Sequence, residues 1–477
     1  MTVHGSLMGS SAESWRGTGS SPVPGTYPRY VQAPMLVFLV FLAFVVVRYV
    51  AANDRMDLLS TIRFEFLLGA ASIVLAIIQL SARKPEIGSA RVLLIAIVLL
   101  FFCMILELPL AADPVEARRV FIDRAFKFAM LTFLLMVFVE SPRYMQLFLW
   151  AFLFSIFYIT LESVQGLISG GLYWQNQGVM RLHGAVPMYG HPNSLGGVSL
   201  GALPFVFYLW SEMKRWYLRA GLLALAGTAS TCVVYSGSRT AYVGIIGLIM
   251  WMFYQSKRKG RFLLVVLVFG ALFVAVLPKQ YIERFESIGG QEKEGNSKLA
   301  RIQILRDAWT ILLENPLGVG VASFPAKRTQ RFGRSQDTHN LYLEVATNLG
   351  VQGFVVFCVM VASMFATLRR ATLDFGAQRR RLLRIARRGP PRGVRVAMAR
   401  HDRDLGLLIA VSRATGGFIF VRLVLGAFGM DLYEIYWWFG AGIAVALSGM
   451  AVTTARRTDF FDAAMSDDLP QGGPTPS

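Results

Sequence analysis

The chain alternates long apolar stretches with shorter polar connections. A helix that crosses a bilayer needs about 20 mostly apolar residues. Twelve segments approach that length, at about 34–52, 64–80, 92–112, 120–139, 145–167, 195–210, 217–236, 240–254, 262–278, 350–368, 405–429 and 432–452. The pattern predicts an all-α integral membrane protein with about 12 transmembrane helices.

The composition agrees with a membrane protein and excludes a soluble enzyme. Of the 477 residues, 55% are hydrophobic and only 16% are charged, against about a quarter charged in ordinary soluble domains. The net charge of +19 would suggest nucleic acid in a soluble protein. In a membrane protein it first indicates orientation by basic cytoplasmic loops, so no nucleic-acid partner is expected.

The basic residues fall mainly in connections of one parity. They follow segments 2, 6, 8 and 10, and the last of these connections, 369–404, contains twelve arginines and three aspartates. By the positive-inside rule these loops are cytoplasmic, and both termini then lie on the same side. The arginine-rich loop would orient the chain and contact anionic membrane lipids.

The organisation predicted from these boundaries has seven parts. They are a disordered cytoplasmic N-terminus at 1–33, transmembrane helices 1–9 over 34–278, an extracytoplasmic cap at 279–339, the helix 10 region at 340–368, the arginine-rich loop at 369–404, helices 11 and 12 over 405–452, and a cytoplasmic tail at 453–477. No secretory signal is recognised in the first 33 residues, so the first helix is expected to be retained.

The stretch 279–339 is the most informative polar region. Its part from Lys298 to Glu314 has helical periodicity, and a proline and two glycines after it end that helix. A further short helix is expected to start near 338–340. The stretch is therefore predicted to fold as a helical cap, facing the same side as the other long polar connection, 168–194.

Several common catalytic motifs are missing. The sequence has no phosphate-binding G-x-x-x-x-G-K-[ST], no G-x-S-x-G and no H-E-x-x-H. Its three cysteines, Cys103, Cys232 and Cys358, lie in separate apolar runs without metal-ligand spacing. The pair Asp402 and Asp404 sits among arginines, which favours ion pairs over a metal. We expect neither a metal nor a cofactor.

Two arginines on the extracytoplasmic side are candidates for binding an anion. Arg239 lies at the tip of a hairpin between two apolar helices, after Ser236-Gly237-Ser238. A charge so close to the hydrocarbon is costly unless it has an anionic partner, although a snorkelling arginine is the simpler alternative. Arg301 lies on the predicted cap helix. It either faces solvent or helps to bind a phosphate-bearing ligand.

His339 is the strongest catalytic candidate. It directly precedes an apolar stretch, so it is expected near the first turn of a helix, where the helix dipole keeps the imidazole neutral, as a general base requires. A surface or capping histidine is the alternative. Secondary candidates, for a site or for a structural role, are Arg181, His183, His191 and Asn340.

His339-Asn340, nine residues and then Gly350-x-x-Gly353 resemble the H-N-x9-G-x-x-G pattern of the bacterial O-antigen ligase and polymerase superfamily. The Ser238-Arg239 turn and Arg301-x-x-x-Leu305 also look like that family. The resemblance implies a GT-C-like fold with a periplasmic cap, in the bacterial inner membrane. His339 would activate the acceptor hydroxyl, while Arg239 and Arg301 would hold the donor diphosphate.

The resemblance implies a metal-independent, inverting glycosyltransferase whose donor is a glycan on undecaprenyl diphosphate. In a ligase the acceptor is a sugar of the lipid A core, and in a polymerase it is another lipid-linked glycan. A flippase or transporter of lipid-linked sugars is an alternative from a different class. Two arginines within segment 11, Arg413 and Arg422, should point inward and either line the lipid path or pair with Glu107, Glu162 or Glu434.

Overall fold

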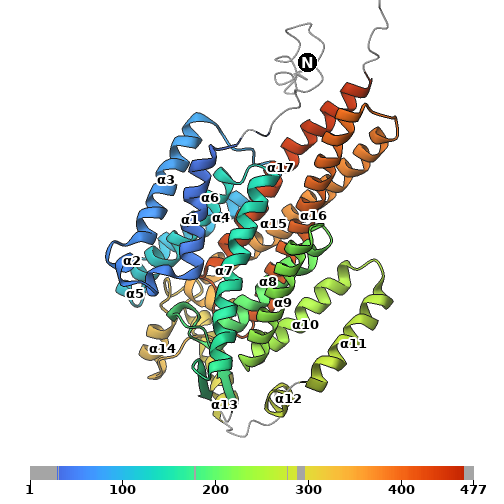
Figure 1. The fold of residues 1–477 in the computed structure, drawn as a ribbon. Coiled ribbons are helices and arrows are strands. Elements are labelled where there is room, and N and C mark those ends of the chain that lie inside the picture. Colours follow the sequence, from blue (N-terminus) through green and yellow to red (C-terminus); the bar gives the residue numbers. More distant parts are fainter. Residues whose placement is uncertain (1–29, 31, 177–178, 277, 287–295, 467–477) are drawn as a thin grey trace, which may run out of the picture.

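A computed structural model describes residues 30, 32–176, 179–276, 278–286 and 296–466 (Figure 1). The predicted helical character is confirmed, because each of the twelve apolar segments coincides with a helix. One element was not expected: residues 173–182 form a two-stranded antiparallel hairpin in which Tyr173 pairs with Leu182. The N-terminal region predicted to be disordered, and the last part of the C-terminal tail, lie almost wholly outside the described residues.

The elements follow one another in this order. They are α1 (Met35–Val50), α2 (Asp57–Thr61), α3 (Phe64–Ala82), α4 (Arg91–Glu107), α5 (Pro114–Val120), a π-helical turn (Phe121–Phe126), α6 (Lys127–Phe138), α7 (Pro142–Ser169), β1 (Tyr173–Asn176), β2 (Val179–Leu182), α8 (Pro192–Trp210), α9 (Trp216–Tyr235), α10 (Arg239–Gln255), α11 (Lys259–Val276), α12 (Lys279–Glu286), α13 (Asn296–Glu314), α14 (Phe324–Phe332), α15 (Leu341–Ala386), α16 (Arg392–Gly426) and α17 (Ile435–Ser466). Short 3₁₀ turns lie at Ala52–Asp54 and Pro187–Tyr189.

Six of the described helices are long and apolar enough to cross a membrane. They are α3, α7, α9, α15, α16 and α17. Helix α1 is apolar but shorter. These helices support a multi-pass membrane protein, whereas the number of twelve spans stays a prediction.

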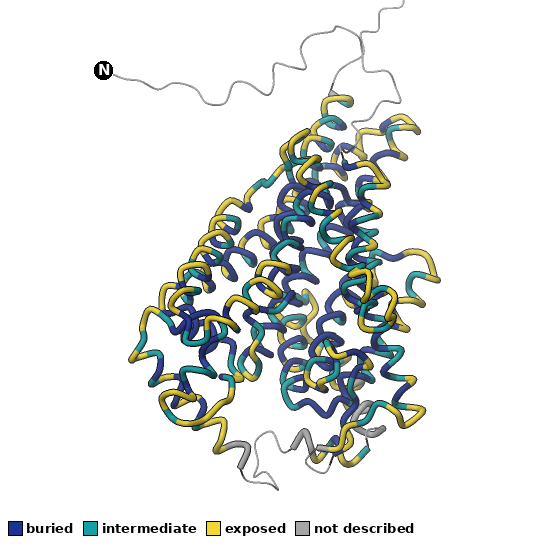
Figure 2. The backbone as a smooth tube through the Cα atoms, turned by 90° about the vertical axis from the view of Figure 1, so that its left-hand side faces the viewer, coloured by how far each residue is buried: buried dark blue, intermediate teal, exposed yellow. Residues whose placement is uncertain are grey.

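Helix α17 lies at the centre of the bundle. It packs against α6, α15 and α16, and its residues Trp437, Trp438 and Phe439 are fully buried. The outer helices instead expose large apolar side chains, such as Leu36, Phe66 and Phe102. Figure 2 shows buried backbone along the middle of the bundle and exposed backbone along its sides. Apolar outer surfaces on this scale are typical of helices that contact lipid.

The prediction of a loop at 369–404 is wrong. Helix α15 continues to Ala386 and α16 begins at Arg392, so only 387–391 form a connection. Arginine, leucine and alanine are strong helix formers, and the stretch buries one face through Phe375, Leu382 and Ile385. Gly389-Pro390-Pro391 then ends the helix. The end of α17 packs beside these segments, and we call residues 369–404 and 453–466 the helical stalk.

Ion pairs hold the helical stalk together. Arg379 donates to Asp402 with an Nε–Oδ1 distance of 2.7 Å, which confirms the expected ion pair for that aspartate. Arg381 binds Asp462 at 2.7 Å through its Nη2 and also contacts Asp459. Both described ends of the chain, near residue 32 and at Ser466, lie at the end of the bundle where the stalk projects, opposite α13 and α14 (Figure 1).

Gly350 interrupts the regular backbone of α15. Its φ of 69° and ψ of −176° are not helical, and a Cβ there would lie 2.3 Å from the backbone of Leu317. The connection after α13 runs alongside this break, and the Val351 N–H donates to the Pro316 carbonyl at 2.9 Å. The close neighbour of Gly350 is therefore the backbone of an irregular segment and not another helix.

Candidate functional site

A cavity of about 1270 Å³ lies between the cap and the helix bundle. Arg239, Arg301 and His339 all line it, although they come from α10, α13 and the segment before α15. Two secondary candidates, Arg181 and His191, line the same cavity. Residues separated by up to 158 positions in the sequence are thus brought to one place.

His339 lies just before α15, two residues ahead of the first helical residue. Its φ of 48° is unusual for a residue with a side chain, so the folded surroundings hold the backbone in this turn. Burial of the imidazole lowers its pKa below the ordinary value, because the charged form loses contact with water. The negative charge of Asp337 opposes this effect by raising the pKa, and the positive charges of Arg301 and Arg328 lower it further. The ring is therefore neutral near pH 7.

Asn340 has a structural role at the start of α15. Its side-chain oxygen accepts a hydrogen bond from the Leu343 N–H at 3.1 Å, which caps the helix. Its Nδ2 donates to the Ala427 carbonyl at 3.1 Å and ties this turn to the end of α16. Asn340 is not among the residues that line the cavity, so it positions the neighbouring His339.

The turn between α9 and α10 places Arg239 at the cavity. Gly237 has a φ of 55°, and Ser238 caps α10 by accepting a hydrogen bond from the Ala241 N–H at 3.2 Å. This confirms the tight hairpin expected at this position. Arg239 is then the first residue of α10 and lines the cavity, so the N-terminus of this helix, where anions are favoured, also lies at the cavity.

Arg181 braces the same turn. Arg181 is 6% exposed, and its guanidinium donates to the Ser236 carbonyl at 2.9 Å and to the Asn193 side chain at 2.7 Å. It therefore joins β2, the α9–α10 turn and the start of α8. These bonds suit a residue that holds the site in shape.

The two remaining histidine candidates differ. His191 caps α8, because its Nδ1 accepts a hydrogen bond from the Asn193 N–H at 3.1 Å. Desolvation lowers the pKa of this ring, and the charges of Arg181 and His339 lower it further. His183 does not line the cavity, and its Nδ1 lies 2.9 Å from the Gly184 carbonyl.

Arg301 lies on α13, and a buried ion pair fixes that helix to α14. The Arg328 Nε donates to Asp307 at 2.9 Å, and both side chains are 2% exposed. The helix predicted at 298–314 is confirmed as α13, whereas α14 was not expected. Separating α13 from α14 would leave a buried charge without a partner, which is costly. The ion pair therefore keeps the two helices together and fixes the position of α13, which carries Arg301.

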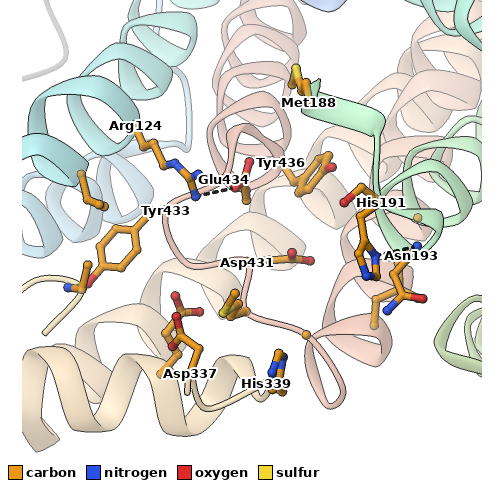
Figure 3. A pocket seen from close by; sticks show the side chains of 18 of the residues that line it. Arg124, Met188, His191, Asn193, Asp337, His339, Asp431, Tyr433, Glu434 and Tyr436 are labelled. Carbon is orange, nitrogen blue, oxygen red and sulfur yellow. Dashed lines mark hydrogen bonds and ion pairs between the residues drawn. The ribbon is translucent and has the colours of Figure 1, made fainter. Parts of the chain in front are cut away.

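The carboxylates of the cavity are the main group that the sequence analysis missed. Six arginines and eight acidic residues line it, so the lining is mixed in charge and not simply cationic. Figure 3 shows Asp431 projecting between His339 and His191, with Asp337 on the same segment as His339. Glu434 accepts a hydrogen bond from Arg124 at 3.1 Å.

Arg422 is a second residue whose place in the site the sequence left open. It lies 3% exposed in the cavity wall, stacks on Tyr436 at 3.2 Å from the ring centre, and donates to the Gly197 carbonyl at 2.9 Å. Its nearest carboxylate is Asp431 at 3.8 Å. Arg413, one of the same candidate pair, does not line the cavity.

The arrangement suits transfer chemistry on an anionic ligand. Arginine side chains and a helix N-terminus stabilise phosphate oxygens, and a neutral imidazole accepts a proton. Among the described residues, no group of three or more His, Cys, Asp or Glu side chains has an arrangement that could hold a metal ion. The expected independence from metals stays a prediction.

Comparison with known families identifies one region of the chain. Residues 222–358 match the family model described as O-antigen ligase. This match confirms the resemblance to the O-antigen ligase and polymerase superfamily, and it covers Arg239, Arg301 and His339. No curated protein matches the chain significantly.

Proposed function

We propose that this protein is a glycosyltransferase that moves a glycan from undecaprenyl diphosphate to a sugar hydroxyl on the acceptor, in the manner of an O-antigen ligase. The acceptor is then the lipid A core. The observation that carries the proposal is that Arg239, Arg301 and His339 line one cavity within a region that matches the ligase family. In this proposal the protein lies in the bacterial inner membrane with the cavity facing the periplasm and both termini in the cytoplasm.

The proposed reaction needs only groups that line the cavity. The acceptor oxygen attacks the anomeric carbon, the bond from that carbon to the diphosphate oxygen breaks, and undecaprenyl diphosphate leaves with the bonding electrons. Arg239 and Arg301 stabilise the negative charge that grows on the diphosphate. His339 takes the proton from the acceptor hydroxyl. Attack from the face opposite the leaving group inverts the anomeric centre.

The energy for transfer is supplied by the donor itself. A sugar on a lipid diphosphate has a good leaving group, so the proposed reaction requires no nucleotide in the periplasm. Independence from a metal ion is part of the same proposal, because fixed guanidinium groups act on the leaving group. A polymerase would use the same donor, arginines and base with a second lipid-linked glycan as acceptor.

Deleting the gene in its native host distinguishes these reactions. A ligase predicts that long polymer accumulates on undecaprenyl diphosphate, while the lipid A core carries no polymer. The measurement is electrophoresis and mass spectrometry of the lipid-linked and surface glycan pools, with the wild-type gene restored as control. A single unextended repeat unit would support a polymerase, and lipid-linked units retained on the cytoplasmic face would support a flippase. Unchanged pools in all fractions would contradict the proposal.

The pH dependence of transfer tests the protonation state of His339. Because the pKa of His339 is lowered and a base must be deprotonated, the rate is expected to rise with pH, and the midpoint of this rise should lie below about pH 6.5, the ordinary histidine pKa. Asp337 raises that pKa, so Asp337→Asn should move the rising limb to lower pH. The measurement is kcat/KM against pH for both proteins. A limb unmoved by the substitution would contradict this assignment.

A further inference from the structure

The charged residues that line the cavity belong to two separate sets. Lining residues from the range 181–304 include three arginines and no acidic residue. The eight acidic lining residues all come from the ranges 48–128 and 322–436, together with the other three arginines. We call the lining residues of 181–304 the basic wall and those of the other two ranges the acidic wall.

The two walls lie on different sides of the cavity. Figure 3 shows Arg124 and Tyr433 of the acidic wall on one side, and His191 and Asn193 of the basic wall on the other. Arg181 of the basic wall donates to the Asn193 side chain at 2.7 Å, so β2 and the beginning of α8 form one surface. The opposite charges are therefore separated in space and not only along the chain.

The acidic wall is also one surface. The Glu344 carboxylate on α15 accepts a hydrogen bond from the Leu432 N–H at 3.1 Å, and Leu432 directly follows Asp431 in the chain. Arg124 of the π-helical turn reaches the same connection and donates to Glu434 at 3.1 Å. Residues from three distant parts of the sequence thus line one part of the cavity.

His339 lies where the two walls meet. The charge of Arg301 in the basic wall lowers the pKa of its imidazole, and the charge of Asp337 in the acidic wall raises it. In the proposed reaction the arginines hold the diphosphate, so the acceptor hydroxyl must reach His339 from the other side. The cavity of about 1270 Å³ exceeds the roughly 300–1,000 Å³ typical of a single small-molecule site, so it has room for both substrates.

Each arginine of the acidic wall has a carboxylate partner. The pairs are Arg48 with Glu65 at 3.2 Å, Arg124 with Glu434 at 3.1 Å and Arg422 with Asp431 at 3.8 Å. The other acidic residues leave this wall with an excess of carboxylates over arginines. A phosphate or carboxylate placed here would have to displace a paired carboxylate, and it would face like charges.

An uncharged sugar suits the same surface. A guanidinium only donates hydrogen bonds and a carboxylate only accepts them, whereas a hydroxyl group does both. Neighbouring hydroxyl groups of one sugar can therefore bind Arg124 and Glu434 together without separating this pair, whose side chains are 56% and 26% exposed. Tyr433 and Tyr436 in the same wall offer aromatic surfaces with a polar tip.

We propose that the acidic wall binds the acceptor and selects one whose reacting sugar carries neither phosphate nor carboxylate, with Glu434 and Arg124 binding its hydroxyl groups. This inference rests on the proposed glycan transfer. The basic wall then holds the donor diphosphate. A diphosphate at the acidic wall would meet carboxylates, so the two substrates are kept in their own places.

The experiment measures initial rates of transfer from purified lipid-linked donor in lipid vesicles. One acceptor is a lipid A core that ends in a neutral hexose. Two others carry a phosphate ester or an uncharged acetyl group on that hexose, away from the reacting hydroxyl. The kcat/KM of the wild-type protein is expected to be about tenfold or more lower for the phosphorylated acceptor than for the neutral one, and close to the neutral value for the acetylated one.

Substitutions at the ion pair test the assigned residues. Glu434→Gln should raise the KM for the neutral acceptor about tenfold and leave the KM for the donor unchanged. Glu434→Lys should reduce the preference for the neutral acceptor over the phosphorylated one, because it replaces a negative charge by a positive one. Arg124→Gln should raise the same acceptor KM from a more exposed position. The unfolding temperature of each variant shows that it is folded.

Glu314→Gln is the matched control. Glu314 also pairs with an arginine, Arg331, at 3.1 Å, but neither residue lines the cavity. The acceptor KM of this variant should change by less than about twofold, within the usual range for surface substitutions.

Several results would overturn the inference and leave the proposed transfer intact. They are equal kcat/KM values of the wild-type protein for the neutral and phosphorylated acceptors, an equal loss with the acetylated acceptor, and an unchanged acceptor KM in both Glu434→Gln and Arg124→Gln. A rise in the donor KM alone would assign Glu434 to the donor and would overturn it as well. Absence of transfer from the wild-type protein to every acceptor would contradict the proposed function itself, and the inference would fail with it.

Discussion

Replacing His339 by alanine is expected to reduce glycan transfer about 10²- to 10⁴-fold, the usual contribution of a general base. His339 lines the cavity shared with Arg239 and Arg301, and its lowered pKa keeps the ring unprotonated at neutral pH. Without the imidazole the acceptor hydroxyl has no group to receive its proton. The measurement is the initial rate of transfer from purified lipid-linked donor to purified acceptor, with protein in lipid vesicles.

The control for His339→Ala is a second histidine on the same side of the molecule. His183→Ala should leave the rate nearly unchanged, because His183 does not line the cavity. Donor binding by His339→Ala should also stay close to wild type, since the arginines remain. A His339→Ala protein that is folded and transfers glycan at the wild-type rate would remove the imidazole from the mechanism.

Replacing Arg239 or Arg301 by glutamine is expected to reduce kcat about 10²- to 10³-fold each, as for loss of one group that stabilises transition-state charge. Arg239 lies at the N-terminus of α10, and Arg301 faces the cavity from α13. If both hold one diphosphate, the double variant should lose less than the product of the two single effects. Lysine at either position should restore part of the rate, because it keeps the charge without the bidentate geometry.

Arg306→Gln is the matched control for this pair. Arg306 is exposed on the same helix as Arg301 and does not line the cavity, so its loss should change the rate by less than about twofold, within the usual range for surface substitutions. Equal losses for Arg306→Gln and Arg301→Gln would mean that the cap contributes a general positive field. In that case neither residue would hold the diphosphate directly.

The helices and the core of the site could be predicted from the sequence because their signals are local. Apolar runs identify helices wherever they occur, and the turn at Ser238-Arg239 is visible as a short polar break between two such runs. Arg239 and His339 could be singled out because each is polar and borders an apolar segment. Their meeting in one cavity depends on how α10 and α15 pack, which no local pattern contains.

The carboxylates around the site could not be assigned in the same way. Asp431 lies in the short connection between α16 and α17 and reaches the cavity only because α17 occupies the centre of the bundle. Asp431 directly follows an apolar segment that contains Arg422, and this position could have indicated that its carboxylate lies near that arginine. Asp337, two residues before His339, offered a similar one. That these carboxylates and the arginines and histidines of the site face one cavity becomes clear only from the folded structure.

The helical stalk is a case in which a high density of charged residues made a helix difficult to predict from the sequence. The high arginine content of 369–404 predicts a polar loop between membrane helices, yet arginine favours helices as strongly as leucine does. The apolar residues Phe375 and Leu382 recur there at helical spacing. A hydropathy pattern identifies only the apolar part of a membrane helix. It therefore does not show whether the helix continues beyond the membrane into water or ends at the last apolar turn.

The backbone break at Gly350 has a mechanical consequence. Helix α15 spans 46 residues, which would measure about 69 Å at 1.5 Å per residue if the helix were unbroken, and it joins the helical stalk to the end of the bundle that contains the cavity. In an unbroken helix, a displacement of the stalk end would be transmitted along the helix to His339, which precedes its first turn. The glycine lies only eleven residues beyond His339, so the short piece next to the imidazole is clamped to the cap by its own hydrogen bonds. The break at Gly350 therefore divides α15 into a short segment that is hydrogen-bonded to the cap beside His339 and a long segment that ends in the helical stalk.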